Sequence, residues 1–475
     1  MKAFNENFSS ATVATLSFKQ APTTNIEKIG LITATPKPPA GVAEIIGRSS
    51  FGSRFLETKV HLHQRLLEIM NLSIIDKIPE DQFKRDAGKL VRGLLDDEEI
   101  AISAIEREQL VEEILHEVLG LGPLEPLLQD DTIADILVNT HENVFVERYG
   151  RLERTPIRFK DERHLTRIIE KIVMGVGRRV DESSPMVDAR LADGSRVNAI
   201  IPPLAVDGPL LSIRKFSRIP LSIDKLIDIG AMTREMAEVI EAIVKSKMNI
   251  LISGGTGSGK TTMLNAMSTY INDDERILTI EDAAELQLQQ SHVGRLETRP
   301  ANIEGKGEIK QRELVKNALR MRPDRIIVGE VRGSEAFDML QAMNTGHEGS
   351  MTTIHANSPR DALSRLENMV SMAEMSLPLH VVRAQAASAI DVVLQLSRLN
   401  DGSRRIMSLQ EITGMEGEII SMHEIFKFDR VSTDEDGNIH GNYIATGIRP
   451  KFCENLEAMG VSLPASVFAP NNQLA

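Results

Sequence analysis

The strongest chemical signal in the sequence is a glycine-rich segment between a strand-like run and a helix-like run. Residues 249–253 are mostly apolar and precede GGTGSGKTT, after which a helical pattern begins. This spacing fits GxxxxGK[ST], in which backbone N–H groups and a helix N-terminus surround phosphate, the lysine reaches the outer phosphates and the hydroxyl holds Mg²⁺. A ligand-free Gly-rich turn is the alternative that this spacing disfavours. The predicted nucleotide-binding residues are Gly254, Gly255, Thr256, Gly257, Ser258, Gly259, Lys260, Thr261 and Thr262.

Carboxylates end two later strand-like runs. Glu281 and Asp282 close RILTIED, with Glu285 shortly after, and Glu330 follows IIVG. The carboxyl ends of parallel strands meet at one edge of a sheet, where open α/β folds bind ligands. Hydrolysis needs a metal-holding acid and a residue that orients or deprotonates water. One such acid is usually a solvated charge or a helix cap, but two after one phosphate loop favour function.

Two histidines lie in the stretch TGHEGSMTTIHAN. His347 precedes a short polar strand and His355 closes it. A single histidine is more often a surface or satisfied core residue than a catalytic one. The pair could instead respond to the γ-phosphate, whereas metal ligation lacks matching third ligands.

The elements that must position these residues fall into several regions of the 475-residue chain. Helical periodicity dominates after a Ser-, Thr- and Pro-rich start, mixed strands and helices follow, and strands then alternate with helices after the linker. The fold class is therefore α/β. The predicted regions are a disordered tail (1–60), a helical bundle (61–120), an N-terminal α/β domain (121–219), a linker (220–235), the phosphate-loop domain (236–460) and a C-terminal tail (461–475).

Composition excludes several classes of protein. The net charge of −13 and 4% aromatic residues argue against a dedicated nucleic-acid binder. The single cysteine, Cys453, excludes an internal disulfide and a clustered-cysteine metal site. No charge-free apolar run is long enough for a membrane span, and no secretory signal is visible, so we expect a cytoplasmic protein.

With these motifs in place, the sequence resembles the secretion ATPase superfamily of type II secretion, type IV pili, archaeal flagella and type IV secretion. The resemblance rests on Gly-Glu at 329–330, on the "Asp box" TIED at 279–282, and on the "His box" from TGH at 345–347 to TIHAN at 353–357. Within that group, RLADGSRVNAIIPP, SIRKF, MRPDRIIVGEVRG and LQEITGMEGEII resemble the tight-adherence (Flp) pilus assembly ATPases of the CpaF/TadA type. The similarity covers about residues 60–460 and implies a C-terminal RecA-like domain and an N-terminal PAS-like α/β domain.

The resemblance implies roles for individual residues. Glu281 would be the general base, with Asp282 and Glu285 in support, and Glu330 would act at Mg²⁺ or water. Thr261, Asp282 and Glu330 are the expected Mg²⁺ ligands. The sequence leaves open which glutamate deprotonates water, because Glu281 and Glu330 can titrate as a pair. His347 and His355 would sense the γ-phosphate. Arginines of the N-terminal domain would close on the nucleotide. Arg320, Arg322 and Arg332, which lie near the strand that ends in Glu330, are further candidates for this role. The matching N-terminal positions are Arg190, Arg196 and Arg214.

The resulting hypothesis is a Mg²⁺-dependent ATPase that powers assembly of a tight-adherence pilus, with retraction left open. Its expected partners are copies of itself in a homohexamer and inner-membrane platform proteins, with no direct nucleic-acid contact, so the protein would be peripheral to the inner membrane. The alternatives are a type IV secretion traffic ATPase, a nucleotide-gated scaffold with little hydrolysis, and a nucleic-acid motor, which the composition disfavours.

Overall fold

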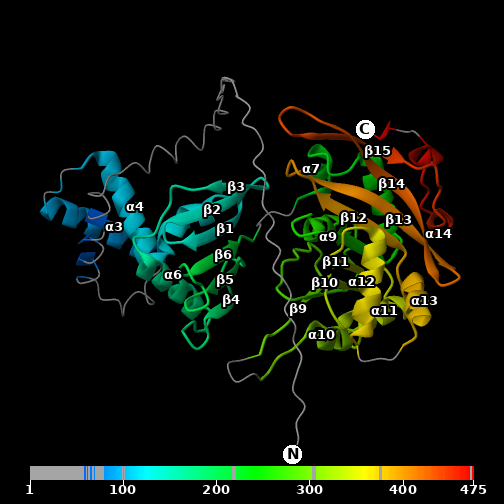
Figure 1. Cartoon of the computed structure of the whole chain (residues 1–475), viewed down its shortest axis with the longest axis horizontal. Coiled ribbons are helices and arrows are strands. Elements are labelled where there is room, and N and C mark those ends of the chain that lie inside the picture. The colour runs from blue at the N-terminus through cyan, green and yellow to red at the C-terminus, as the bar shows by residue number, and fades with distance from the viewer. Residues whose placement is uncertain are drawn as a thin grey trace, which may run out of the picture. The chain divides into compact units, whose positions relative to one another are not determined.

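The structure is a computed structural model, and Figure 1 shows the chain. It describes residues 58, 59, 61, 62, 65, 66, 69, 80–98, 100, 102–216, 221–301, 306–373, 377–470, 473 and 474. All of these belong to the compact unit Ser53–Ala475. The predicted tail at 1–60 lies outside the described residues except for Thr58 and Lys59. In the described part, no helix combines the length and apolarity needed to cross a membrane.

A helical module opens the described chain. Its two long helices are α3 (Glu80–Asp97) and α4 (Ala104–Leu119). Helix α4 begins with a capping box, in which Ser103 and Glu106 satisfy each other's backbone N–H groups. Helical residues between 58 and 69 pack on this pair, and the shared core is apolar at helical spacing. Its buried residues are Leu62, Leu66, Val91, Leu94, Leu95, Leu110, Val111 and Ile114.

An antiparallel sheet with one long helix forms the next domain. After η2 (Gly122–Leu124) and α5 (Glu125–Gln129), six strands pair in the order β3-β2-β1-β6-β5-β4. Helix α6 (Glu162–Gly175) covers one face and buries Leu165, Ile169 and Ile172. The opposite face carries polar residues, as expected for strands that alternate between core and solvent. The strands are β1 (Ile133–Thr140), β2 (Asn143–Arg148), β3 (Arg151–Arg154), β4 (Met186–Arg190), β5 (Arg196–Ile200) and β6 (Leu210–Arg214).

A ten-stranded sheet carries the phosphate loop, in the order β16-β15-β14-β13-β12-β7-β11-β10-β8-β9. The strands from β12 to β9 in this order are parallel, and those from β13 to β16 are antiparallel. The α/β class is thereby confirmed. The strands are β7 (Ile250–Gly254), β8 (Ile277–Glu281), β9 (Val293–Glu297), β10 (Arg325–Val331), β11 (Met351–Ile354), β12 (Val392–Arg398), β13 (Arg404–Glu416), β14 (Ile419–Thr433), β15 (Ile439–Ala445) and β16 (Gln473–Leu474).

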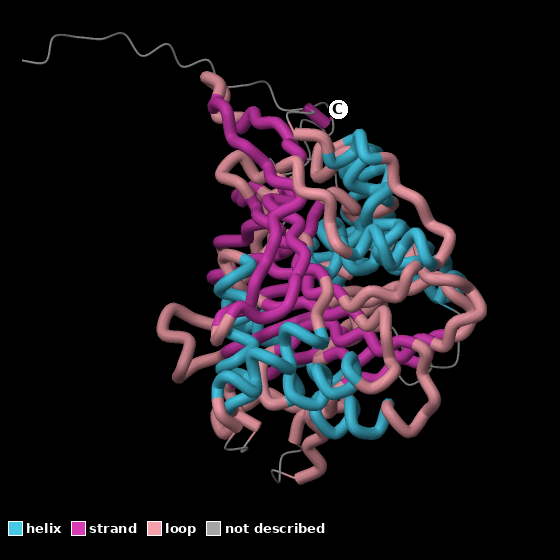
Figure 2. Tube along the Cα trace, turned by 90° about the vertical axis from the view of Figure 1, so that its right-hand side faces the viewer, coloured by secondary structure: helices cyan, strands magenta, loops and turns pink. Residues whose placement is uncertain are grey.

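Helices cover both faces of the parallel part, so the strands lie between helices (Figure 2). On β7, Ile250 and Ile252 point into one core and Leu251 into the other. Helices α8 (Arg234–Lys245) and α9 (Lys260–Ser268) form the first core with the sheet. The second core contains α10 (Gln311–Ala318), α11 (Glu335–Asn344), α12 (Pro359–Ser371) and α13 (Leu379–Ala389).

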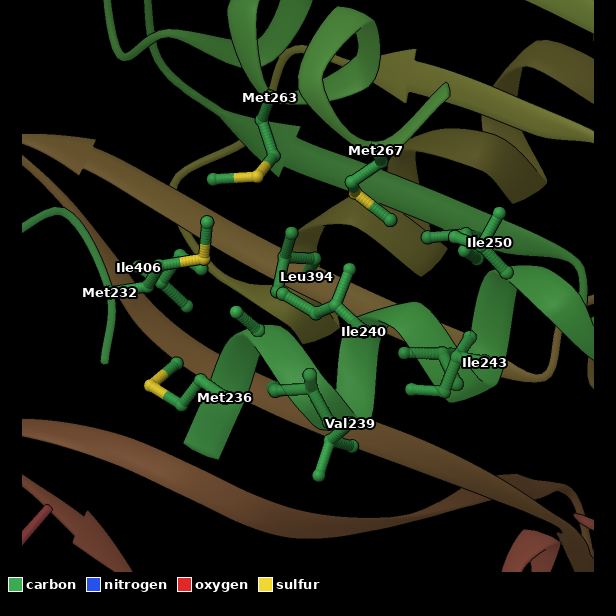
Figure 3. Packing of buried hydrophobic residues seen from close by; sticks show 14 of the residues in the cluster. Met232, Met236, Val239, Ile240, Ile243, Ile250, Met263, Met267, Leu394 and Ile406 are labelled. Carbon is green, nitrogen blue, oxygen red and sulfur yellow. The ribbon is translucent and has the colours of Figure 1, made fainter. Parts of the chain in front are cut away.

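Methionines fill the first core around α9. Met263 and Met267 of this helix are 2% and 1% exposed, and Figure 3 shows them between β7 and α8, with Ile240 and Leu394 nearby. These two methionines therefore pack as ordinary core residues, as their unbranched side chains allow. Because α9 is held on its whole inner face, its N-terminus is fixed against the sheet.

Two segments differ from the sequence prediction. The predicted linker at 220–235 contains α7 (Ile223–Asp228), whose Ile223 and Leu226 are buried in the core of the phosphate-loop domain. After α14 (Phe452–Ala458), the predicted C-terminal tail at 461–475 contains η3 (Ala465–Phe468) and β16, with Val467 and Phe468 in the same core. Both segments are short and contain proline or glycine, so neither shows a clear helical or strand period, yet each contributes buried side chains.

Candidate nucleotide-binding site

The phosphate loop runs from the end of β7 to the start of α9. Gly259 is the N-cap of α9 and has φ of 93°, a left-handed conformation that strains any residue with a Cβ. This turn directs the first N–H groups of α9 and its partial positive charge to one point above the loop. The loop therefore has the backbone conformation that a phosphate-binding loop requires.

Lys260 begins α9 and is held by the loop itself. Its Nζ donates hydrogen bonds of 3.0 Å to the carbonyls of Gly254 and Gly255. Burial lowers the pKa of Lys260, and Arg332 and Arg365 lower it further, whereas Glu330 opposes them. The ammonium group thus sits at the loop in a cationic environment that an anionic ligand would relieve.

Glu281 ends β8 and is almost fully buried, with 3% of its surface exposed. Its Oε2 accepts hydrogen bonds from the backbone N–H groups of Glu285 (2.7 Å) and Leu286 (2.9 Å). Its Oε1 is buried and has no hydrogen-bond partner among the described residues. Burial raises the pKa of Glu281 despite these two donors. One fixed and one unpartnered oxygen, together with a raised pKa, suit a proton acceptor.

Glu330 lies on β10, the strand next to β8, and is bound by Arg332. The Arg332 guanidinium donates to Glu330 through Nε at 2.9 Å and through Nη2, and its Nη1 lies 3.4 Å from Asp282 Oδ2. Burial works against the charge of Arg332, but its hydrogen bond to Glu330 leaves its pKa raised. Arg332 thus joins the two acids that the sequence analysis assigned to Mg²⁺.

Gly329 explains the unusual Gly-Glu end of β10. A methyl group on Gly329 would lie 3.0 Å from Cγ of Glu281, which is closer than packed carbon atoms normally approach. The absence of a side chain at this position lets Glu281 fold against β10. The close approach of Glu281 therefore explains why a glycine precedes Glu330 on this strand.

The two histidines lie at opposite ends of β11. Because β11 is parallel to β7 and pairs Ile354 with Ser253, His355 follows at the edge that carries the phosphate loop. His347 precedes the strand at the other edge, and four residues of strand span about 13 Å. Its Nδ1 is buried without a hydrogen-bond partner in the described part of the chain. The structure therefore brings His355, but not His347, to the loop edge within one chain.

Two of the three predicted N-terminal arginines contact the segment after Glu281. Arg190 Nη1 lies 2.8 Å from Glu297, and its Nη2 donates to the Ala284 carbonyl. Arg196 Nη1 lies 2.8 Å from Glu285. Arg214 instead pairs at 3.2 Å with Asp135 of its own domain.

A polar cavity of about 1170 Å³ separates the N-terminal sheet face from this segment. Its lining includes all three of these arginines, Asp282 and Arg332, but no residue of the phosphate loop. The other candidates from the sequence, Arg320 and Arg322, precede β10 and so lie at the edge away from the loop.

Three arginines near the loop carry no motif and were missed by the sequence analysis. Arg404 donates from Nε to the Gly257 carbonyl at 2.9 Å. Arg398 ends β12, which pairs directly with β7, and Arg365 on α12 lies close enough to affect the pKa of Lys260. The proximity of Arg398 and Arg404 to the loop becomes visible only from the strand order, because β12 follows β7 by some 140 residues.

Residues that could hold a metal ion directly are few. The described part contains no group of three or more His, Cys, Asp or Glu side chains arranged around a common point. Mg²⁺ at a nucleotide site does not need such a group, because it keeps several waters and is bound mainly through substrate phosphates and one or two protein oxygens. Thr261, Asp282 and Glu330 remain the candidates for those oxygens.

Comparison with known proteins identifies the family of this chain. The sequence profile described as Type II/IV secretion system protein matches residues 117–435. The chain belongs to this family. A putative conjugal transfer protein of Mycobacterium tuberculosis is 38% identical to this member of the type II/IV secretion system family over 330 residues, which are 68% of this chain and 93% of that protein.

Two further similarities accompany it. The type IV secretion system protein PtlH of Bordetella pertussis is 35% identical over 312 residues, which cover 60% of this chain and 91% of PtlH. The crystal structure of the VirB11 ATPase from the Brucella suis type IV secretion system has 28% sequence identity and a TM-score of 0.33, with 61% of this family member and 95% of VirB11 covered.

Proposed function

We propose that this chain is an ATP-hydrolysing motor of a secretion machine. The observation that carries the proposal is that Lys260 and the phosphate loop lie at the same edge of the parallel sheet as the buried carboxylate of Glu281. Lys260 and the α9 N-terminus would bind the phosphates, and Glu281 would accept the proton of the attacking water through Oε1. We assign this role to Glu281 because Arg332 occupies Glu330.

Mg²⁺ would be held by the Thr261 hydroxyl, with Asp282 and Glu330 turned towards it directly or through water. The ion would neutralise charge that develops on the phosphates. His355 lies at the sheet edge that carries the phosphate loop, where it would respond to the γ-phosphate. His347 lies at the opposite edge of the sheet. Its predicted role as a γ-phosphate sensor would therefore require a nucleotide that is not bound at the phosphate loop of its own chain.

Arg190 and Arg196 are proposed to approach the γ-phosphate when the N-terminal domain closes. Each now pairs with an acidic residue next to the Glu281 segment, so closure would exchange those carboxylates for phosphate oxygens. A cation at the developing γ-charge can contribute a factor of 10³–10⁵ in rate. Arg214 would have to leave Asp135 to take part.

For the machine itself, we propose a tight-adherence pilus assembly ATPase of the CpaF/TadA type, a homohexamer at the cytoplasmic side of inner-membrane platform proteins. The quoted CpaF/TadA-like segments support this assignment. A type IV secretion or conjugal transfer motor is the second candidate, and it is supported at least as well, since the M. tuberculosis relative and PtlH carry those names. Loss of surface pili, rather than of export or conjugation, in a deletion strain would favour the first.

The test of motor activity is steady-state ATP hydrolysis by the full chain beside two variants. Glu330→Gln should bind ATP with turnover lowered at least about 10²-fold, whereas Glu241→Gln, which alters an exposed α8 ion pair with Lys245, should match wild type. Mass in solution with and without ATP should show a hexamer-sized species. Negligible turnover of a monomeric wild-type chain would support the scaffold alternative instead.

A further inference from the structure

Two arginines flank the outer side of the phosphate loop. Arg398 ends β12 and Arg404 begins β13, and the register between β12 and β7 pairs Leu396 with Gly254. Arg404 is anchored by its Nε bond to the Gly257 carbonyl. A methyl group on Gly257 would lie 3.4 Å from Arg398 Nη1, so both guanidinium groups border the same stretch of loop.

Both arginines share one carboxylate of the N-terminal domain. Glu147 on β2 lies 3.6 Å from Arg398 Nη1 and 3.5 Å from Arg404 Nη2, and only 15% of its side chain is exposed. Arg398 also donates to the carbonyl of Gly150, in the turn between β2 and β3. The β2–β3 hairpin is therefore tied to the phosphate loop by two cations and one anion.

This arrangement leaves one positive charge without a counter-charge in the triad. Burial and the neighbouring Arg398 lower the pKa of Arg404, while Glu147 and the more weakly acting Asp135 oppose them only in part. A guanidinium group presents paired donors that match phosphate as well as carboxylate. Phosphates bound at the loop and the carboxylate of Glu147 would thus draw on the same two side chains.

We propose that Arg398 and Arg404 contact nucleotide phosphates bound at the loop, and that Glu147 competes with those phosphates for them, so that nucleotide binding releases the β2–β3 hairpin. This rests on the proposed function only in requiring that the loop binds a nucleotide. Its distinctive consequence is that removing the acid and removing an arginine change affinity in opposite directions.

The test measures ADP and ATPγS affinity of the full chain by calorimetry at low salt. Glu147→Gln should tighten binding about three- to fivefold, the size of a partly exposed ion pair. Arg404→Gln should weaken it about tenfold, through loss of a charge-assisted hydrogen bond to the loop. Arg404→Lys should restore part of that loss, and Arg234→Gln, in an exposed ion pair with Asp224, should bind like wild type.

Two further measurements separate competition from general damage. In the Arg398→Gln/Arg404→Gln background, Glu147→Gln should have no effect, and in the native background its effect should fade at about 1 M salt. Because the chain contains no Trp, a Tyr149→Trp variant reports on the hairpin, and its emission should change when ADP is added.

Weaker or unchanged binding in Glu147→Gln, or an effect that survives in the double-arginine background, would overturn the competition while leaving the motor intact. Unchanged indole emission from the Tyr149→Trp variant at saturating ADP would overturn the release of the hairpin. A wild-type chain that binds no nucleotide would instead remove the proposed function, and this inference with it.

Discussion

The buried carboxylate of Glu281 allows catalysis and folding to be separated by two substitutions. In Glu281→Gln, the amide oxygen can still accept the N–H groups of Glu285 and Leu286, while the NH₂ group replaces the unpartnered oxygen. In Glu281→Ala, both N–H groups lose their acceptor, at a cost of about 1–3 kcal/mol each. We therefore expect a destabilisation of about 2–6 kcal/mol for the alanine variant and less than about 1 kcal/mol for the glutamine variant.

Both variants should lose turnover by about 10²- to 10⁴-fold, the usual contribution of a general base. The assays are denaturant unfolding followed by circular dichroism, and phosphate release at saturating ATP. A glutamine variant that turns over within about tenfold of wild type would exclude Glu281 as the base. A glutamine variant as unstable as the alanine variant would show that the charge itself supports the fold.

The pH dependence follows from the direction of the pKa shift. Since burial raises the pKa of Glu281, the folded state prefers the protonated acid. Ionisation therefore costs stability as the pH rises through that pKa, and glutamine avoids this cost. The stability of Glu281→Gln relative to wild type should be near zero at pH 4 and should increase towards pH 8. A constant difference across this range would contradict the raised pKa.

Three other changes have definite expected results. Lys260→Ala should abolish nucleotide binding in calorimetry while keeping a wild-type melting curve, because Nζ of the lysine donates to the loop carbonyls of Gly254 and Gly255 and not to the core. Near-normal turnover would refute the site. Glu117→Gln should destabilise the chain by about 3 kcal/mol, since Lys59 and His164 hold the pKa of the buried Glu117 at about 2. That stabilisation should be present above pH 4.5 and be lost as the pH falls towards 2 in urea titrations, whereas a flat acid profile would argue against the network. Gly329→Ala should cost about 1–3 kcal/mol by overpacking against Glu281 and should lower turnover as well; unchanged kinetics would show that Glu281 can move away.

Much of the fold could be predicted because local patterns agree with it. The strand–loop–helix of residues 249–268 and the apolar period of α6 are visible without tertiary information. Strand β4 has no such local signal, because Val187 is its one buried residue. The segments around Ile223 and Val467 were assigned to a linker and a tail, since their burial depends on a core built by distant strands.

Site residues at the ends of parallel strands could be predicted from the sequence. Site residues whose position depends on strand register or on pairing between distant strands could not. The edge shared by Lys260, Glu281 and Glu330 follows from parallel strands alone. The separation of His347 from His355 depends on where β11 begins. The spacing of the two histidines, eight residues, does not show this. Arg398 and Arg404 reach the loop through the pairing of β12 with β7, a contact between distant parts of the chain that has no local signature.

The attachment of the helical module has a mechanical consequence. Helix α4 is fixed at its C-terminal end, where Glu117 binds His164 at 2.9 Å and Lys171 donates to the carbonyls of Val118 and Gly120. Its 16 residues make it about 24 Å long. A turn of about 15° of the N-terminal domain, the size of subunit rotations in allosteric assemblies, would swing the far end of α4 by about 6 Å. A small rotation of the N-terminal domain would thus become a displacement of about one helical turn, about 5.4 Å, at the far end of α4.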